Sequence, residues 1–314
     1  MTPRTVVALV LAAGAWGLGT VVSKHAVETV PPLTLFGIQL ATSLAALALL
    51  MRARGIPIRA GGPALLGRLG VLNPGLAYAL SLIGLATVSA SLSVLLWAME
   101  PLLILLLGAV ILREEITAGL VGATVVALFG LGILVYEPAI GGQIVGIALT
   151  VAGVGCCAVY TVITRRWIRA SDGTAQVVFA QQAYALGFAL VAVLAAGVID
   201  GGAGLGSISP FDLASAAASG LLYYAAGYWL YLSALKEVPA SIAATSFYLI
   251  PIFGLAGAFL FLGERLDLQQ SIGAAVVLVA LVAIVRPRFR LVEAAQPGPV
   301  NRSTAGTAAR SDPA

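Results

Sequence analysis

Glu100 is a carboxylate within the long apolar stretch LSVLLWAMEPLLILLLGAVIL, residues 92–112. A charge at the centre of a membrane helix costs about 3 kcal/mol, whereas each Leu, Ile or Val offsets about 0.3–0.6 kcal/mol. The stretch holds thirteen Leu, Ile and Val residues, so we expect it to insert into a bilayer with the carboxylate facing protein or water. Three interpretations of Glu100 remain open: a group that takes up a proton on one side of the membrane and releases it on the other, a binding group for a ligand ammonium, or a structural pair with another residue.

Pro101 follows Glu100 directly, and a second proline, Pro251, lies 150 positions later. Each proline removes one backbone hydrogen bond and kinks its helix. The carbonyls freed beside Pro101 could line a cavity, because irregular backbone is tolerated in membranes where it borders one. A kink that serves packing alone is the alternative. Because the kink recurs, we expect Pro101 and Pro251 to shape gates.

Other polar side chains also lie inside apolar runs. Asn73 precedes Pro74, and the amides Gln39 and Gln182 either line a cavity or join helices by hydrogen bonds. Lys24 ends the first apolar run, where it either snorkels to the interface or faces a pore. The predicted substrate-binding residues combine these groups with aromatic side chains: Glu100, Gln39, Gln182, Asn73, Tyr78, Trp97, Tyr224, Tyr228, Tyr248 and Lys24.

The composition predicts which elements position these residues. Hydrophobic residues make up 60% of the 314 and charged residues 10%, with a mean hydropathy of +1.04. A soluble domain carries about 25% charged residues, so we expect an all-α membrane protein. A membrane helix takes about 20 apolar residues. Charges, Pro and Gly delimit ten candidate spans: 5–23, 33–51, 65–84, 89–112, 118–136, 144–163, 175–197, 213–234, 240–262 and 270–286.

The basic residues predict the orientation of these spans. With the N-terminus in the cytoplasm, 15 of the 17 Lys and Arg residues fall on the cytoplasmic side, and only Lys24 and Arg265 fall outside. This bias predicts a multi-pass protein of the inner, or plasma, membrane with both termini cytoplasmic. Residues 291–314, rich in Pro, Ala and Ser, are expected to form a disordered cytoplasmic tail. The basic residues are not interleaved with aromatics, so lipid is an expected partner and nucleic acid is not.

The sequence also repeats itself. At an offset of 150, residues 76–91 align with 226–241, and Glu114 aligns with Glu264. We expect these two carboxylates to cap helix N-termini, where negative charge is favourable.

The repeat predicts two domains of five helices each, residues 1–138 and 139–290. Because five is odd, the second copy must enter the membrane upside down relative to the first. Inverted repeats that enclose a central cavity near the bilayer midplane are typical of transporters. We therefore expect ten transmembrane helices, arranged as two inverted five-helix repeats around a central cavity.

Other protein classes lack their motifs in this sequence. The single histidine, His25, and the adjacent Cys156 and Cys157 form no pattern for a metal or a nucleophile, and neither H-E-x-x-H nor G-x-S-x-G occurs. No P-loop surrounds either lysine, which argues against ATP-driven transport. We expect no enzyme activity, no metal and no cofactor, and we expect the two cysteines to serve packing.

The motifs AWGLGTVVSK (15–24) and VPASIAATSFYLIPIFGLAGAFLFLGERL (238–266) resemble the EamA branch of the drug/metabolite transporter superfamily. The resemblance covers residues 5–290 and is nearest to the YddG-type exporters of amino acids and metabolites in bacterial inner membranes. It implies ten helices, a central cavity that alternates between the two sides, and secondary transport of small metabolites, commonly outward. Gln39 stands where many relatives carry Arg, so the resemblance does not imply an anion-selective cavity.

Together these features favour a secondary active transporter that exports small metabolites, with amino acids as the expected substrates and protons as one candidate coupling ion. Amides, aromatic rings and one acid suit a zwitterionic or weakly polar molecule. A carrier of drugs, purines or other metabolites with the same fold is the alternative. A channel or a scaffold that does not transport is the alternative from a different class.

Overall fold

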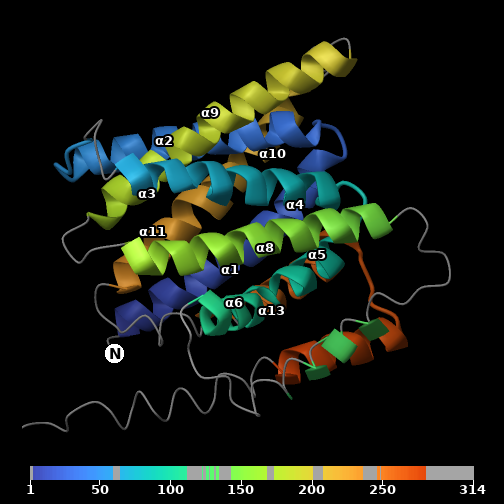
Figure 1. The fold of residues 1–314 in the computed structure, drawn as a ribbon. Coiled ribbons are helices and arrows are strands. Elements are labelled where there is room, and N and C mark those ends of the chain that lie inside the picture. Colours follow the sequence, from blue (N-terminus) through green and yellow to red (C-terminus); the bar gives the residue numbers. More distant parts are fainter. Residues whose placement is uncertain are drawn as a thin grey trace, which may run out of the picture.

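The computed structural model describes residues 3–58, 64–111, 143–167, 173–200, 208–235, 246–247 and 249–280, with short helical pieces between 122 and 133. Within these residues the chain forms helices and connecting loops, and no strand (Figure 1). Tyr248, Glu114, the expected tail 291–314 and most of the expected span 118–136 lie outside the described residues.

The labelled elements alternate between long helices and shorter segments that interrupt them. In chain order they are α1 (Pro3–Val27), α2 (Pro32–Ala53), α3 (Ala64–Arg68), η1 (Leu69–Val71), η2 (Leu72–Leu76), α4 (Ala77–Leu85), α5 (Ala90–Trp97), α6 (Glu100–Ile111), α8 (Ile144–Trp167), α9 (Thr174–Asp200), α10 (Pro210–Gly220), η5 (Leu221–Ala226), α11 (Gly227–Leu235) and α13 (Leu249–Leu262). A further apolar helix covers Leu268–Ala280.

Local sequence signals explain several of these boundaries. Proline occupies the first turn of α2 and of α10, where its missing N–H would have no helical partner in any case. Ser209 and Asp212 form a capping box at the start of α10. Gly55 (φ 65°) follows α2 and Gly263 (φ 67°) follows α13, and these left-handed residues end their helices at little steric cost.

Five helices of the described part of the chain are long and apolar enough to cross a membrane. They are Pro3–Val27, Pro32–Ala53, Leu66–Leu85, Ile144–Thr164 and Ala175–Gly197. Large apolar side chains such as Leu49, Leu194 and Phe261 are 70%, 70% and 73% exposed on the outside of the bundle. Exposed apolar area of this kind suits contact with lipid rather than water, so the chain is a multi-pass, all-helical membrane protein.

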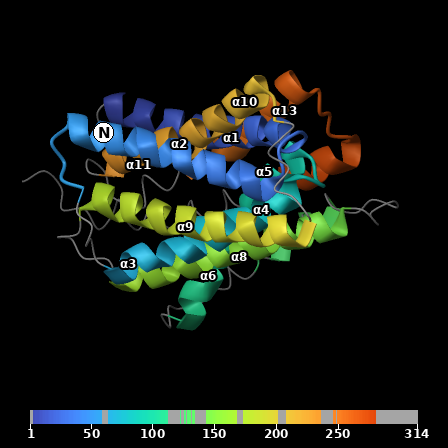
Figure 2. The ribbon, with the colours of Figure 1, turned by 90° about the horizontal axis from the view of Figure 1, so that it is seen from above.

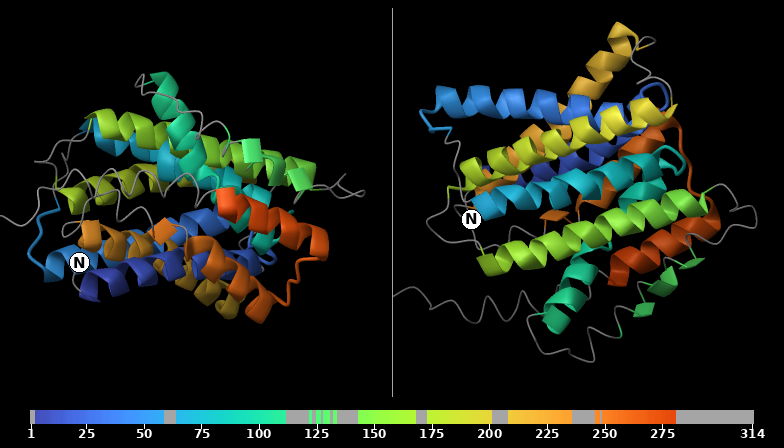
Figure 3. Two further views of the ribbon diagram at one scale, coloured as in Figure 1. Left: turned by 90° about the horizontal axis from the view of Figure 1, so that it is seen from below. Right: turned by 45° about the horizontal axis from the view of Figure 1, so that its top comes forward.

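The helices form two layers, seen from above in Figure 2. One layer contains α1, α2, α10, α11 and α13, and the other contains α3, α8 and α9. Contacts between segments distant in sequence join the bundle: α4 packs on α8, α1 packs on both α11 and α13, and α2 packs on α9. Leu268–Ala280 lies beside the described pieces of 122–133 (Figure 3), where Gln269 Nε2 donates to the Ile133 carbonyl at 2.9 Å.

Glycine permits the closest of these crossings. A Cβ atom at Gly17 of α1 would lie 2.7 Å from both the Gly254 nitrogen and the Ile250 carbonyl oxygen of α13. Any side chain there would push α13 away from α1. Small residues are used in this way throughout membrane bundles, because packing rather than the hydrophobic effect holds their helices together.

Interruptions occur at matching places in the two halves of the chain. The kinked segment η2, with Asn73 at its bend, and the π-helical segment η5 lie in the third helix of each predicted repeat. The expected single span 89–112 is divided into α5 and α6 by a turn at residues 98–99. Glu100 therefore begins a helix instead of lying at the centre of one. The physical reason is the following proline, which has no N–H for a continuous helix and fits best in a first turn.

Candidate functional site

A cavity of about 260 Å³ lies between the two layers of helices, and it is called the Glu100 cavity below. Its lining comes from both halves of the sequence. The lining residues are Trp16, Asn73, Tyr78, Val94, Trp97, Ala98, Glu100, Ile104, Cys157, Tyr160, Thr161, Tyr223, Tyr228, Tyr231, Phe247, Ile250 and Pro251. This volume suits a small molecule, and sites of this kind combine apolar walls with a few polar groups.

Glu100 is the acidic residue of this lining, and it lies in the first turn of α6. The positive end of the helix dipole favours a carboxylate at that position. The Cys157 thiol of α8 donates a hydrogen bond to Glu100 Oε1 at 3.0 Å. A thiol is a weak, uncharged donor, and no Lys, Arg or His occurs among the lining residues that the structure describes. The described wall of the cavity therefore supplies no cation to neutralise this carboxylate.

Asn73 contributes a second acceptor to the same cavity. Its side chain is only 3% exposed, and Oδ1 has no hydrogen-bond partner. Asn73 has extended backbone angles (φ −145°, ψ 120°) inside η2, which interrupt the helix and bring the amide into the cavity wall. A buried acceptor without a donor is costly, so a ligand with an N–H or O–H group would relieve this cost.

Three aromatic rings separate the Glu100 cavity from a much smaller one, and we call Tyr78, Trp97 and Tyr223 the aromatic partition. Tyr78 stacks on Trp97 at 5.0 Å between ring centroids and meets Tyr223 edge-on at 5.3 Å. The same three residues also border a space of about 20 Å³. That second space is lined by the polar residues Thr20, Ser23, Gln39, Ser81 and Ser93 and by apolar ones such as Leu82 and Leu85. The aromatic partition is thus the thin wall between two neighbouring cavities.

The opposite wall of the Glu100 cavity is also aromatic. Trp16 of α1 meets Tyr228 of α11 edge-on at 5.7 Å and Phe247 at 5.4 Å. Tyr231 stacks on Phe247 at 5.0 Å. Rings that hold one another in this way form a rigid surface, which can pack an apolar body or face a cation.

The structure brings together six of the residues predicted from the sequence: Asn73, Tyr78, Trp97, Glu100, Tyr228 and Pro251 all line the Glu100 cavity. Tyr224 borders the smaller space instead. Pro101 lies in the first turn of α6.

Gln39 and Gln182 take part in hydrogen bonds between helices, which was the second interpretation of these amides. Gln39 Nε2 donates to Ser23 Oγ at 2.9 Å and to Ser219 Oγ at 2.7 Å. Gln182 Oε1 accepts from Ser43 Oγ at 2.8 Å, and Gln182 Nε2 donates to a backbone carbonyl of η5 at 3.2 Å. Neither amide lines the Glu100 cavity.

Lys24 is half-buried at the end of α1, and its ammonium donates to the Leu85 carbonyl at 3.0 Å. It lines neither of the two spaces described above. The bond joins the end of α1 to the end of α4, so Lys24 ties two helix ends together.

Sequence reasoning did not select several residues of the cavity. Cys157, Tyr160 and Thr161 share one face of α8 through i, i+3 and i+4 spacing. That spacing is visible in the sequence, but which face meets the cavity depends on how α8 packs against α4 and α6. Cys157 was expected only to pack, and it also donates a hydrogen bond to Glu100. Helix packing likewise decides that Trp16, Tyr231 and Phe247 line the cavity.

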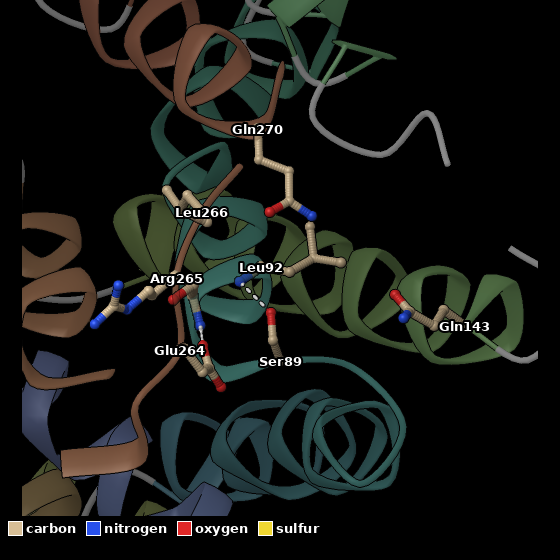
Figure 4. A pocket seen from close by; sticks show the side chains of 8 residues that line it. Ser89, Leu92, Gln143, Glu264, Arg265, Leu266 and Gln270 are labelled. Atoms are coloured by element: carbon tan, nitrogen blue, oxygen red, sulfur yellow. Dashed lines mark hydrogen bonds between the residues drawn. The ribbon is translucent and has the colours of Figure 1, made fainter. Parts of the chain in front are cut away.

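A second pocket of about 220 Å³ surrounds Glu264, and we call it the Glu264 pocket (Figure 4). Glu264 Oε1 accepts from the Ala90 N–H and Oε2 from the Ser91 N–H, both at 2.8 Å. Ser89 caps the same helix by accepting from the Leu92 N–H at 3.1 Å. The carboxylate of Glu264 therefore caps a helix N-terminus, as expected, and the helix is α5 of the other half of the chain.

Among the described residues, no group of three or more His, Cys, Asp or Glu side chains is arranged to hold a metal ion. The described polar groups of the site are one carboxylate, one unpartnered amide, one thiol and the hydroxyls of Thr161 and of the tyrosines.

A bundle of long apolar helices with an ionisable group in an internal cavity is typical of membrane transporters. The model of the EamA-like transporter family matches residues 3–136 and again 144–286. The chain therefore belongs to the EamA-like transporter family.

Relatives with the same general description occur in bacteria and archaea. A protein of Archaeoglobus fulgidus named "Uncharacterized transporter" is 24% identical over 287 residues, which cover 90% of this chain and 99% of that protein. A protein of Clostridium kluyveri with the same name is 26% identical over 179 residues, or 55% of this chain and 56% of that protein's length. The chain shares its fold with a solved crystal structure at a TM-score of 0.62, with 17% identity, covering 90% of this chain and 98% of the other.

Proposed function

We propose that this protein is a secondary active transporter that exports small amine-bearing metabolites across the inner membrane by alternating access. The observation that carries the proposal is the Glu100 cavity: about 260 Å³ between two helical layers, with aromatic walls and one carboxylate. Intramembrane carboxylates mark substrate or ion pathways, because lipid offers them no partner. Amino acids, the substrates expected from the sequence, carry an amine that Glu100 could bind.

The proposal includes two inverted repeats, residues 1–138 and 139–290. The two family matches, 3–136 and 144–286, support this division. The helix contacts support it as well. In the two repeats α4 corresponds to α11, α6 to α13 and α8 to α1. The packing of α4 and α6 on α8 is matched by the packing of α11 and α13 on α1. Interruptions at η2 and η5 recur at equivalent positions, so each half would supply one wall of the cavity.

In the proposed topology both termini are cytoplasmic and the described form opens inward. Tyr160 and Tyr231 lie toward the ends of α8 and α11 that would face the cytoplasm. At the opposite end, the bond from Lys24 to Leu85 and the bonds to Glu264 hold the helix ends together. The aromatic partition lies between, so it would be the gate that opens when the carrier turns outward. The helix starts at Pro101 and Pro251 would be its hinges.

Transport by purified protein in proteoliposomes tests this function. Radiolabelled amino acids, purines and organic amines are offered under imposed proton gradients, with empty liposomes as the control. A carrier gives uptake that saturates and that accelerates when unlabelled substrate is placed on the far side. A channel gives flux without that acceleration and a scaffold gives none, and either result would overturn the proposal.

Access from one side provides a second test. In a background with Cys156 and Cys157 replaced by alanine, Ile104→Cys places a thiol in the Glu100 cavity. We expect a membrane-impermeant maleimide to label it from the cytoplasmic side, and substrate to slow the labelling. Ala53→Cys, exposed at the end of α2 that would face the cytoplasm, is the control that substrate should not protect. Labelling of Ile104→Cys from the outer side alone would contradict an inward-open form.

A further inference from the structure

The Glu100 cavity has an unbalanced set of polar groups. Glu100 supplies a carboxylate, and no basic side chain occurs among the lining residues that the structure describes. The described basic residue nearest in sequence to the cavity wall of α1 is Lys24, whose ammonium already donates to the Leu85 carbonyl at 3.0 Å. A substrate that carries a single positive charge would meet its counter-ion in this cavity, and a substrate carboxylate would not.

The helix N-terminus at Glu100 does not supply the missing partner for a carboxylate. Broken membrane helices often turn their N-termini toward anionic groups of substrates. Here α6 and α13 both begin at the cavity wall, α13 through Ile250 and Pro251, and Glu100 itself occupies the first turn of α6. A second carboxylate at that position would be repelled by the first, because like charges at short range disfavour one another strongly in a medium of low dielectric constant.

The unpartnered acceptor of Asn73 points to the same chemistry. Asn73 lines the cavity that holds Glu100, and its Oδ1 is buried and lacks a donor. Two acceptors and no cation suit a ligand group that donates more than one hydrogen bond and carries positive charge. A primary ammonium has three N–H donors, so it could bind both the carboxylate and the amide oxygen.

The aromatic residues suit the remainder of such a ligand. Eight of the seventeen lining residues are Trp, Tyr or Phe. Aromatic faces attract ammonium groups, and their area packs well against a flat or branched apolar body. Glu100 is the charged residue of the described walls. An apolar ligand body that enters the cavity therefore displaces water from few charged groups, and the desolvation cost is small.

We infer that the Glu100 cavity selects protonated monoamines with an aromatic or apolar body and without a free carboxylate: arylalkylamines and amino-acid esters or amides rather than the parent amino acids. This inference rests on the proposed transport function and narrows its substrate class. Glu100 binds the ammonium, Asn73 Oδ1 accepts one of its N–H groups, and the aromatic partition packs against the body.

Four compounds with the same phenyl body test the inference on the unmodified protein: 2-phenylethylamine, phenylalanine methyl ester, phenylalanine and 3-phenylpropionate. Each is titrated against the melting temperature of purified protein and against counterflow of labelled 2-phenylethylamine. We expect the amine and the ester to bind at least about tenfold more tightly than phenylalanine, and 3-phenylpropionate not to bind. Phenylalanine binding as tightly as its ester would overturn the inference and leave the transport function standing.

Two variants assign the preference to individual groups. Glu100→Gln should remove the preference for 2-phenylethylamine over the neutral 2-phenylethanol, whereas the matched variant Glu264→Gln should keep it. Asn73→Leu should reduce the preference for 2-phenylethylamine over its N-trimethyl analogue, which has no N–H to donate. If 2-phenylethylamine raises the melting temperature but shows no counterflow, the ligand class stands and the transport function fails. If Glu100→Gln retains the amine preference, the inference fails.

Discussion

Glu100 and Glu264 are the same residue type in two environments of one molecule. Glu264 has both carboxylate oxygens satisfied by backbone N–H groups of α5, each at 2.8 Å. Glu100 receives a single described hydrogen bond, from the Cys157 thiol at 3.0 Å. Both lie at helix N-termini, but Glu264 reaches across from another segment, whereas Glu100 belongs to the helix that it begins.

The difference between them separates a structural carboxylate from a binding one. A carboxylate with two amide partners has little to gain from a ligand, since each additional bond would replace an existing one. A carboxylate with one weak partner, beside an unpartnered amide oxygen, keeps its capacity for a cation. Incomplete satisfaction of a buried polar group is a stability cost that a binding site retains for its function.

The largest expected effect comes from Glu100→Gln. This change removes the charge but keeps the shape, and a hydrogen bond to a charged group contributes about 3 kcal/mol, so amine affinity should fall about 100-fold. The melting temperature should stay the same or rise, because a buried charge is removed. Counterflow and thermal unfolding of the same preparation measure both. A large loss of stability with unchanged transport would reverse the roles assigned to the two carboxylates.

Trp97→Ala comes next and tests the wall of the Glu100 cavity. Loss of the ring that stacks on Tyr78 should raise the half-saturating amine concentration about tenfold and join the two spaces on either side of the aromatic partition. A cysteine introduced at Ser81, in the smaller space, should then react with a thiol reagent applied from the cytoplasm. Trp97→Phe, which keeps a ring, should protect that cysteine. Equal labelling in both variants would argue against a partition.

Glu264→Gln should act on stability instead of on amine selectivity. The amide side chain offers one carbonyl oxygen, so one of the two N–H groups of α5 at Ala90 and Ser91 loses its partner, at about 1–2 kcal/mol. Thermal unfolding should show a lower midpoint, while the amine preference is kept. Glu28→Gln, an exposed glutamate in the loop after α1, is the control and should leave the midpoint unchanged. If Glu264→Gln and Glu28→Gln unfold at the same midpoint, Glu264 does not stabilise α5 as a cap.

Ser89→Ala gives the smallest expected effect. It removes the side-chain cap that accepts from the Leu92 N–H, which stabilises a helix by about 1 kcal/mol. Since Ser89 and Glu264 cap the same helix, the double variant should lose less stability than the two single losses added together. Strict additivity of the two losses would show that the caps act independently.

The positions of several membrane helices follow from the sequence, because bilayer thickness and hydropathy limit where a helix can span. Apolar runs of about 20 residues must be helices in lipid. In the structure 144–163 and 175–197 are continuous helices, and 65–84 is helical on both sides of a kink at Asn73. The residues Asn73, Glu100 and Tyr228 were identified as site candidates because a polar or aromatic group within an apolar run needs a partner other than lipid.

Tertiary structure decided which of those candidates share a cavity. Gln39 and Gln182 are amides like Asn73, but neither lines the Glu100 cavity: both form hydrogen bonds between helices, and Gln39 also borders the smaller space. Cys157 and Trp16 reach the cavity because α8 and α1 turn those faces inward. In an apolar helix every face resembles the others in sequence, so only the packing of one helix on the next determines which residues face a ligand.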